Sequence, residues 1–267
     1  MPQTAGRVLA GRSRLAERID RVLNGALAGE PAVIVNVSAA DLLGESVPVA
    51  RVISAALARP GSGLSAHWLV TEAFRHSGLA DKIFDSLASG DPAIRAAACR
   101  LCGAMRLTES VPWIGDLMGD PDPLVRRTAT RALGRLGGRR AVEILVGMAD
   151  QVALHRLAIT LAQAASDVDI EALMRQPPSE KAAVATVMAC GLRRDDLRVP
   201  PLLGIGHDQR WPKQVRFAAC KALAMIGDLA ASDGLSQLAT ADPDPNVRAV
   251  AARAHRRLLK TALRRKL

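Results

Sequence analysis

The chain has 267 residues, of which 49% are hydrophobic, 23% are charged and only 2% are aromatic. These fractions exclude wholesale disorder, and the scarcity of aromatic side chains argues against a β-sandwich or a β-barrel. Lys and Arg outnumber Asp and Glu by 36 to 26, a formal charge of +10 that favours acidic partners. The chain is instead rich in Ala, Leu and Arg, which are strong helix formers, and this predicts an all-α protein.

The first part of the chain, residues 1–62, is predicted to form a helical cap. Apolar residues recur at helical spacing over 4–27, and another helix is predicted over 41–57. Residues 59–63, Arg-Pro-Gly-Ser-Gly, are typical of a linker. A further hairpin is predicted over 64–88, in which we expect Trp68 to lie in the core. The linker therefore separates the cap from a second region, residues 63–267.

Compartment signals are sparse. Arginines interrupt residues 1–21, which lack the apolar core of a signal peptide, and no stretch approaches the roughly 20 apolar residues of a membrane span. Four cysteines in a chain of this length do not resemble a secreted disulfide framework. We expect a cytoplasmic protein of a prokaryote.

The clearest feature of the second region is an internal repeat. Residues 91–103 align with residues 122–134, with Asp, Pro, an apolar residue, Arg, Ala and Gly in the same places. One equivalent apolar position can be chosen in each of six copies: Ile94, Val125, Leu154, Ala182, Val215 and Val247. The intervals between them are 31, 29, 28, 33 and 32 residues. A period of this length predicts a solenoid, in which each unit buries its apolar face against its neighbours.

Each repeat is predicted to be a helical hairpin. In the second copy Asp122 is a good helix cap, Pro123 suits the first helical position, and the glycines at 137 and 138 end that helix. A second helix follows from about Ala141. Small Ala and Gly residues at the crossing positions let the helices approach closely, which explains much of the low aromatic content.

The repeated pattern, Asp-Pro-x-Val-Arg-x-x-Ala-x-x-Ala-Leu-Gly, resembles HEAT-like repeats, specifically the short class named after phycobilisome lyases. The resemblance covers about residues 63–267. It implies a right-handed α-solenoid of helical hairpins. It implies little about chemistry, because such arrays serve as scaffolds, nucleic-acid binders and enzymes.

Charged residues recur at fixed places in the repeats and are predicted to be structural. Three Asp and Arg pairs are separated by four residues, and a further arginine occupies the same slot: Asp91, Arg95, Asp122, Arg126, Asp244, Arg248 and Arg216. In repeats resembling these, such residues form a ladder. Each Asp caps its own helix, and each Arg reaches the turn of the next repeat.

A basic stripe is the main candidate binding surface. Arg127, Arg131 and Arg135 recur every four residues, so they share one helix face, and Arg139 and Arg140 extend the stripe. The stripe is either a solvated outer face or a surface for a polyanion, such as nucleic-acid phosphates, an acidic protein or anionic lipid headgroups. Aromatic residues that could stack on bases are missing nearby, which argues against recognition of single strands.

Trp113 is the conspicuous aromatic residue, because it occupies a slot expected to face the concave groove, and Asp116 shares that face. Two interpretations remain open. Trp113 either packs between helices or anchors a ligand in the groove.

The sequence offers no catalytic constellation. Cys99 and Cys102 form a CxxC pair, but a zinc site needs four ligands and Cys190 and Cys220 are isolated. The repeat alignment favours cysteine as a small buried hydrophobe. No histidine is followed by Glu, so the His-Glu pairs of metal-dependent HEAT-repeat hydroxylases are absent. We therefore predict no catalytic residue, no metal and no cofactor.

Three functions follow in order of preference. The first is a non-catalytic scaffold or adaptor that binds a partner protein through its concave or basic surface. The second is a DNA- or RNA-binding solenoid similar to HEAT-like-repeat DNA glycosylases, with Trp113 and Asp116 in the groove and the arginine stripe on the phosphates. The third, a bilin lyase subunit, rests only on the repeat class.

Overall fold

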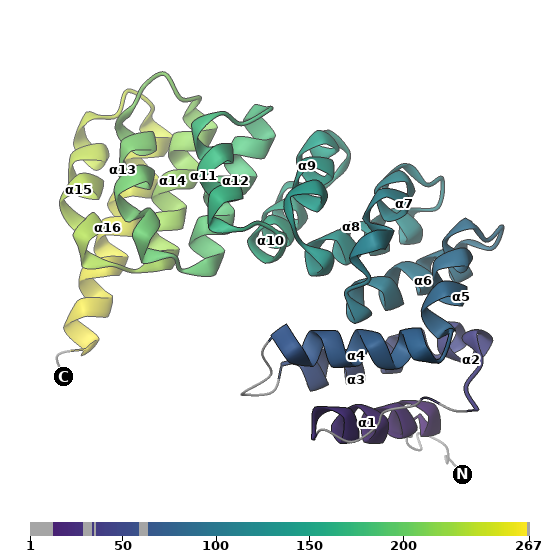
Figure 1. Ribbon diagram of the computed structural model, residues 1–267. Helices are drawn as coiled ribbons and strands as arrows, with labels where there is room; N and C mark the ends of the chain where they lie inside the picture. The colour runs from purple at the N-terminus through teal and green to yellow at the C-terminus, as the bar shows by residue number, and fades with distance from the viewer. Residues whose placement is uncertain (1–12, 29–33, 35, 59–63, 266–267) are drawn as a thin grey trace, which may run out of the picture. The chain divides into compact units, whose positions relative to one another are not determined.

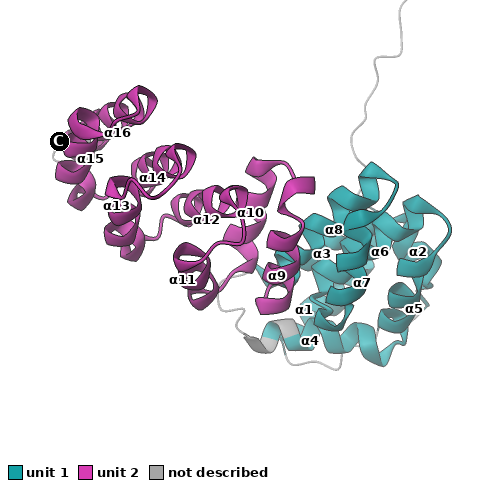
Figure 2. Ribbon diagram, turned by 90° about the horizontal axis from the view of Figure 1, so that it is seen from above, with its two compact units in different colours: residues 1–136 teal, residues 137–267 magenta. Residues whose placement is uncertain are grey.

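The computed structural model describes residues 13–28, 34, 36–58 and 64–265 (Figure 1). Within these ranges the chain forms sixteen α-helices joined by turns and short 3₁₀ segments, without a β-strand. The all-α prediction is therefore confirmed. The chain divides into two compact units, residues 1–136 and 137–267, shown in different colours in Figure 2. None of the helices in the described ranges is both long enough and apolar enough to cross a membrane.

The first unit holds eight helices in its described residues. They are α1 (Arg14–Leu27), α2 (Ala39–Gly44), α3 (Ser46–Leu57), α4 (Leu64–His76), α5 (Leu79–Asp85), α6 (Pro92–Met105), α7 (Val111–Asp116) and α8 (Pro123–Leu136). Helix α1 packs on α3 and α4, α3 packs on α6, and α6 packs on α8. Residues 4–12 of the first predicted helix and the predicted linker 59–63 lie outside the described residues. The boundary at 62/63 stays a prediction.

The helix predicted over 41–57 is instead two helices, so that prediction was wrong. Ser38 and Asp41 form a reciprocal capping box that starts α2, and α2 ends at Gly44. A proline ring clashes with the carbonyl group four residues earlier in a helix. For Pro48 that carbonyl belongs to Gly44, which disfavours an unbroken helix through this segment, and α3 starts at Ser46.

Trp68 does not lie in the core, which corrects a second prediction, because 62% of its surface is exposed. The buried positions of α4 are Ala66, Val70, Ala73 and Phe74, which form one helical stripe. Trp68 projects from a different face of the helix. The apolar residues next to Trp68 in the sequence therefore did not show which face of α4 is buried.

The second unit also holds eight helices. They are α9 (Arg139–Gly147), α10 (Leu154–Ala164), α11 (Asp167–Arg175), α12 (Glu180–Arg193), α13 (Val199–His207), α14 (Lys213–Ile226), α15 (Ser232–Ala241) and α16 (Pro245–Arg265). Helices α10, α12, α14 and α16 pack successively on one another, and α11, α13 and α15 pack against the helix that follows each of them. Figure 2 shows these two layers of successive hairpins. This is the arrangement expected of an α-solenoid.

Small residues allow close contact where the first helices of successive repeats cross. A Cβ atom on Gly103 would lie 2.8 Å from the Cα atom of Ala132, and one on Gly191 would lie 2.7 Å from the Cα atom of Ala222. Real Cβ atoms do not approach a backbone this closely. The predicted close approach is confirmed at both crossings, α6 with α8 and α12 with α14.

Candidate functional site

The strongest candidate site is a groove in the first unit, formed by α3, α6 and α8. Its volume is about 350 Å³. We call it the arginine groove, and it is lined by Arg51, Arg100, Arg127, Arg131, Arg135, Val47, Ala50, Ser54, Leu124, Thr128 and Ala132. Five of these eleven side chains are guanidinium groups, and they come from three different helices.

Helix α8 contributes three of the arginines, and their spacing of four residues places them on one face of the helix. Val125, Ala129 and Leu133 are buried on its inner side. Arg127 and Arg135 lie at the two ends of the outer stripe, exposed to solvent together with the arginine between them. Eight residues rise about 12 Å along a helix, so the three arginines form a row in which successive residues are about 6 Å apart along the helix axis.

Arg100 supplies the floor of the groove from α6. Its side chain is partly buried and donates a hydrogen bond from Nη1 to the hydroxyl oxygen of Ser46 at 2.6 Å. Burial lowers the pKa of Arg100 from its ordinary value, and the positive charges of Arg131 and Arg135 lower it further. A guanidinium nevertheless stays protonated. Like charges therefore face one another across the groove.

Within the described residues, no carboxylate neutralises this charge. The groove lining contains no Asp or Glu, and Arg51, Arg127, Arg131 and Arg135 form no ion pair with any carboxylate in the described part of the chain. Val47 and Leu124 expose apolar side chains beside the arginines. Planar guanidinium donors bind carboxylate and phosphate groups through paired hydrogen bonds. The groove is therefore suited to binding an anionic ligand.

The predicted basic stripe is divided between the two units. Arg127, Arg131 and Arg135 line the arginine groove, whereas Arg139 and Arg140 belong to α9 of the second unit. The Nε atom of Arg139 donates to a carboxylate oxygen of Glu143, one turn later, at 2.9 Å. Arg140 is exposed. Neither residue of α9 lines the groove.

Trp113 and Asp116 lie on α7 and are not among the residues that line the groove. Half of the Trp113 surface is exposed, and its ring packs edge-on against Phe84 at a centroid distance of 4.6 Å. Asp116 is exposed at the end of the same helix. Because the groove is built from α3, α6 and α8, the structure does not bring this pair together with the arginines.

The ladder residues of the first unit make short contacts at the two turns that precede α6 and α8. Asp91 and Asp122 each accept a hydrogen bond from the backbone N–H two residues later, at 2.7 Å. Arg95 donates two hydrogen bonds to the carboxylate of Asp120, at 2.7 and 3.0 Å. These bonds lower the pKa of Asp120. Arg126 donates to the backbone oxygen of Asp120 at 2.7 Å and thereby ties the turn to α8.

The second unit repeats this arrangement with a more deeply buried pair. Arg216 donates to both carboxylate oxygens of Asp242, at 2.9 and 3.2 Å, and to the backbone oxygen of Trp211 at 2.6 Å. Asp244 caps α16, and Arg248 donates to the backbone oxygen of Asp242 at 2.7 Å. Asp120 and Asp242 were missed by the sequence reasoning. Both occupy the first position of the Asp-Pro-Asp-Pro motif, which is a signal that could have identified them.

Two groove residues were also missed. Arg100 stands 31 residues before Arg131, which is the repeat offset, so the alignment could have extended the stripe onto α6. Arg51 lies outside the clear repeats, and no sequence signal indicated which face of α3 meets α6.

Cys99 and Cys102 are buried in α6, as the repeat alignment predicted. Burial raises the pKa of each thiol to about 12. The described residues contain no group of three or more His, Cys, Asp or Glu side chains placed to hold a metal ion.

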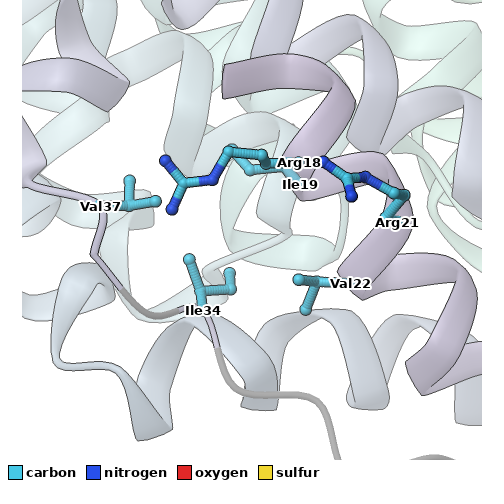
Figure 3. A pocket seen from close by; sticks show the side chains of 6 residues that line it. All are labelled: Arg18, Ile19, Arg21, Val22, Ile34 and Val37. Carbon is cyan, nitrogen blue, oxygen red and sulfur yellow. The ribbon is translucent and has the colours of Figure 1, made fainter. Parts of the chain in front are cut away.

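A smaller pocket of about 200 Å³ lies beside α1. Figure 3 shows its six lining residues, Arg18, Ile19, Arg21, Val22, Ile34 and Val37. Arg18 donates to the backbone oxygen of Asn36 at 3.2 Å. The pocket is mainly apolar, and two guanidinium groups lie on one side of it.

The profile of HEAT repeats matches two consecutive segments, residues 80–164 and 168–256, which together make up well over half of the chain. The chain belongs to the HEAT-repeat family. No curated protein matches it. These HEAT repeats confirm the resemblance inferred from the Asp-Pro-x-Val-Arg pattern.

Three solved structures resemble this HEAT-repeat chain at 17–18% identity. Human deoxyhypusine hydroxylase in complex with glycerol shares 18% identity, with 92% of this chain and 97% of that one covered and a TM-score of 0.36. The complex of CpcE and CpcF of phycocyanin lyase from Nostoc sp. PCC7120 shares 18% identity, with coverages of 79% and 92% and a TM-score of 0.35. An engineered protein shares 17% identity, with coverages of 91% and 96% and a TM-score of 0.32.

Proposed function

We propose that this HEAT-repeat chain is a non-catalytic scaffold that binds an acidic segment of a partner protein in the arginine groove. The observation that carries the proposal is the convergence of five guanidinium groups without a carboxylate among the lining residues. Mutual repulsion disfavours such a cluster in the free protein, and an anionic partner relieves it. The same charge accelerates the encounter with an acidic partner.

The dimensions of the groove favour an extended acidic peptide. Alternate residues of a β-strand lie on one side of the chain about 6.6 Å apart. Successive arginines on α8 are about 6 Å apart along the helix axis. A strand with Asp or Glu at every second position therefore presents one carboxylate to each arginine. The exposed side chains of Val47 and Leu124 offer contacts for apolar residues of the same strand.

The proposal places this scaffold in the cytoplasm. All four cysteines are free thiols. A reducing compartment maintains thiols in this form, whereas oxidising compartments favour disulfides.

Fluorescence anisotropy with a labelled ten-residue peptide of alternating Glu and Val tests the proposal. The triple variant Arg127→Gln, Arg131→Gln and Arg135→Gln should bind the peptide at least tenfold more weakly than the wild type. The matched control is Arg253→Gln, Arg256→Gln and Arg257→Gln, which removes the same charge from exposed positions of α16. The control should change the affinity less than threefold. Equal losses in both variants, or no binding to the wild type, would contradict the proposal.

A nucleic-acid ligand is the second candidate, and the unneutralised arginines also support it. Each phosphate contact contributes about −0.9 to the slope of log K against log salt for duplex DNA. Five arginines therefore predict a slope of up to about −4.5, and the groove variant should lose about three-fifths of it. If a 20-base-pair duplex binds more tightly than the acidic peptide and shows this slope, the ligand of the groove is duplex DNA and not a partner protein. No aromatic residue lines the groove, so single strands are not favoured.

A further inference from the structure

One arginine of the arginine groove is partly buried without a carboxylate partner. Arg100 donates a hydrogen bond to the hydroxyl oxygen of Ser46 at 2.6 Å and forms no ion pair with a carboxylate of the described residues. The largely buried arginines at 95, 198 and 216 each bind a carboxylate. A charge that is removed from water is costly unless an opposite charge compensates it. An anionic ligand beside Arg100 would therefore give this guanidinium the kind of partner that the other three arginines have.

Two more arginines lie close to Arg100, at the point where α6 and α8 cross (Figure 2). The helices approach so closely there that a Cβ atom on Gly103 would lie 2.8 Å from the Cα atom of Ala132. Arg100 stands three residues before Gly103, Arg131 directly precedes Ala132, and Arg135 follows one turn later. All three arginines line the groove, and the charges of the two on α8 lower the pKa of Arg100. We call these three residues the arginine triad.

The carboxylates near these helices are engaged elsewhere. Glu45, which precedes Ser46, accepts a hydrogen bond from the hydroxyl group of Ser13, and Asp120, which precedes α8, binds Arg95. Neither carboxylate lines the groove, and within the described residues no carboxylate forms an ion pair with the arginine triad. The charge of the triad is therefore available to a ligand.

Three guanidinium groups around one part of a groove fit a phosphate monoester better than a carboxylate. A phosphorylated Ser, Thr or Tyr carries a charge of about −1.5 to −2 and three strong acceptor oxygens. A carboxylate carries a single charge and two oxygens, and one arginine can bind both oxygens through paired hydrogen bonds. A phosphodiester of a nucleic-acid backbone also carries a single charge and has two free oxygens. Only the monoester offers a separate oxygen to each arginine of the triad.

We propose that the arginine triad binds the phosphate group of a phosphorylated Ser, Thr or Tyr in the acidic segment of the partner protein. This inference rests on the proposed function, because the same segment lies in the same groove. Arg127 is about 6 Å from Arg131 along the axis of α8, which matches the distance of about 6.6 Å between alternate residues of a strand. Arg127 then binds an Asp or Glu two positions from the phosphorylated residue. Phosphorylation of the partner therefore controls its binding to the scaffold.

Fluorescence anisotropy with labelled peptides and the full chain tests this proposal. The reference is a ten-residue peptide of alternating Glu and Val. In two phosphopeptides, phosphoserine or phosphotyrosine replaces a central Glu. A charge-matched control peptide carries one further Glu in place of a Val. The wild type should bind at least one phosphopeptide at least tenfold more tightly than it binds the charge-matched control.

Single substitutions then locate the phosphate group. Arg100→Gln should weaken the binding of the phosphopeptide at least tenfold and that of the reference peptide less than threefold. The matched control is Arg127→Gln, which removes the same charge from the same groove and should weaken the binding of both peptides by similar factors. The circular dichroism spectrum and the urea midpoint show whether each variant folds. If Arg100→Gln does not fold, Arg135→Gln, at an exposed position, should give the same selective loss.

Each contrary result has a defined meaning. If the reference peptide binds but no phosphopeptide binds more tightly than the charge-matched control, this inference is wrong and the proposed function stands. If no peptide binds to the wild type, both are wrong. A loss in Arg100→Gln or Arg135→Gln that is equal for phosphorylated and unphosphorylated peptides would also overturn the inference. So would inorganic phosphate that binds as tightly as the phosphopeptide in isothermal titration calorimetry, because the segment would then contribute nothing.

Discussion

The buried pair of Arg216 and Asp242 provides the sharpest test of how the repeats hold together. The two side chains are 7% and 2% exposed. Removal of one partner from a buried ion pair leaves the other charge without compensation and costs about 3–5 kcal/mol. The variant Asp242→Ala also removes the acceptor for the backbone N–H of Asp244, which lies 2.8 Å away. We therefore expect a loss of about 4 kcal/mol in the free energy of unfolding.

Urea denaturation followed by far-ultraviolet circular dichroism measures this loss. For a slope of about 2 kcal/mol per molar urea, the midpoint should fall by roughly 2 M. The matched control is Asp233→Ala, an exposed aspartate of the same unit, which should change stability by less than about 0.5 kcal/mol.

The double variant Arg216→Met and Asp242→Leu separates the charge from the packing. Apolar replacement of both members of a buried pair is often close to neutral. The backbone oxygen of Trp211 and the N–H of Asp244 still lose their partners, at about 1 kcal/mol each, so the double variant should be more stable than Asp242→Ala. A single variant that loses less than 1 kcal/mol, or a double variant that is less stable than the single, would refute this account of the pair.

Three further predictions concern packing, pH and reactivity. Gly191→Ala should lose about 1–3 kcal/mol in urea denaturation, because the new Cβ atom meets the backbone of Ala222 at 2.7 Å. Gly204→Ala, with nothing within 4 Å, should gain about 0.5–1 kcal/mol, and the reverse order would contradict the packing argument. The lowered pKa of Asp120 gives stability that is present above pH ~4 and is lost as the pH falls, so Arg95→Met should show a shallower loss of stability between pH 5 and pH 2. Burial raises the pKa of the four thiols to about 11 or 12, so iodoacetamide at pH 8 should label the unfolded chain and spare the folded one; rapid labelling of the folded chain would show that a thiol is accessible.

The helices and their order could be predicted because the information is local. In α8 the cap at Asp122, the apolar period from Val125 and the glycines after Leu136 all agree, and the structure places the helix between them. The break between α2 and α3 was missed although it is local as well. Pro48 lies in the interior of the helix predicted over 41–57, where its ring would meet the carbonyl group of Gly44.

The site was only partly predictable because it depends on which helices meet. Three groove arginines lie on α8, and their spacing alone places them on one face. Arg51 joins them only because α3 packs on α6, and an amphipathic pattern does not state which neighbour a helix will choose. Trp68 was wrongly predicted to be buried for the same reason, because the sequence does not state which face of α4 packs on its neighbours.

The arginines of this chain are of two kinds. They differ in whether their guanidinium groups bind other groups of the protein. Arg216 directs its guanidinium at a carboxylate and a backbone carbonyl, and so holds the turn between two repeats. Arg131 has the same side chain and forms no ion pair within the described residues, so its donors remain available to a ligand. Substitution of Arg216 should therefore destabilise the fold, whereas substitution of Arg131 should leave the urea midpoint nearly unchanged and weaken only the binding of an anion. If both substitutions lowered the midpoint equally, the groove would be part of the framework, and the positive charge of the chain would carry no indication of a partner.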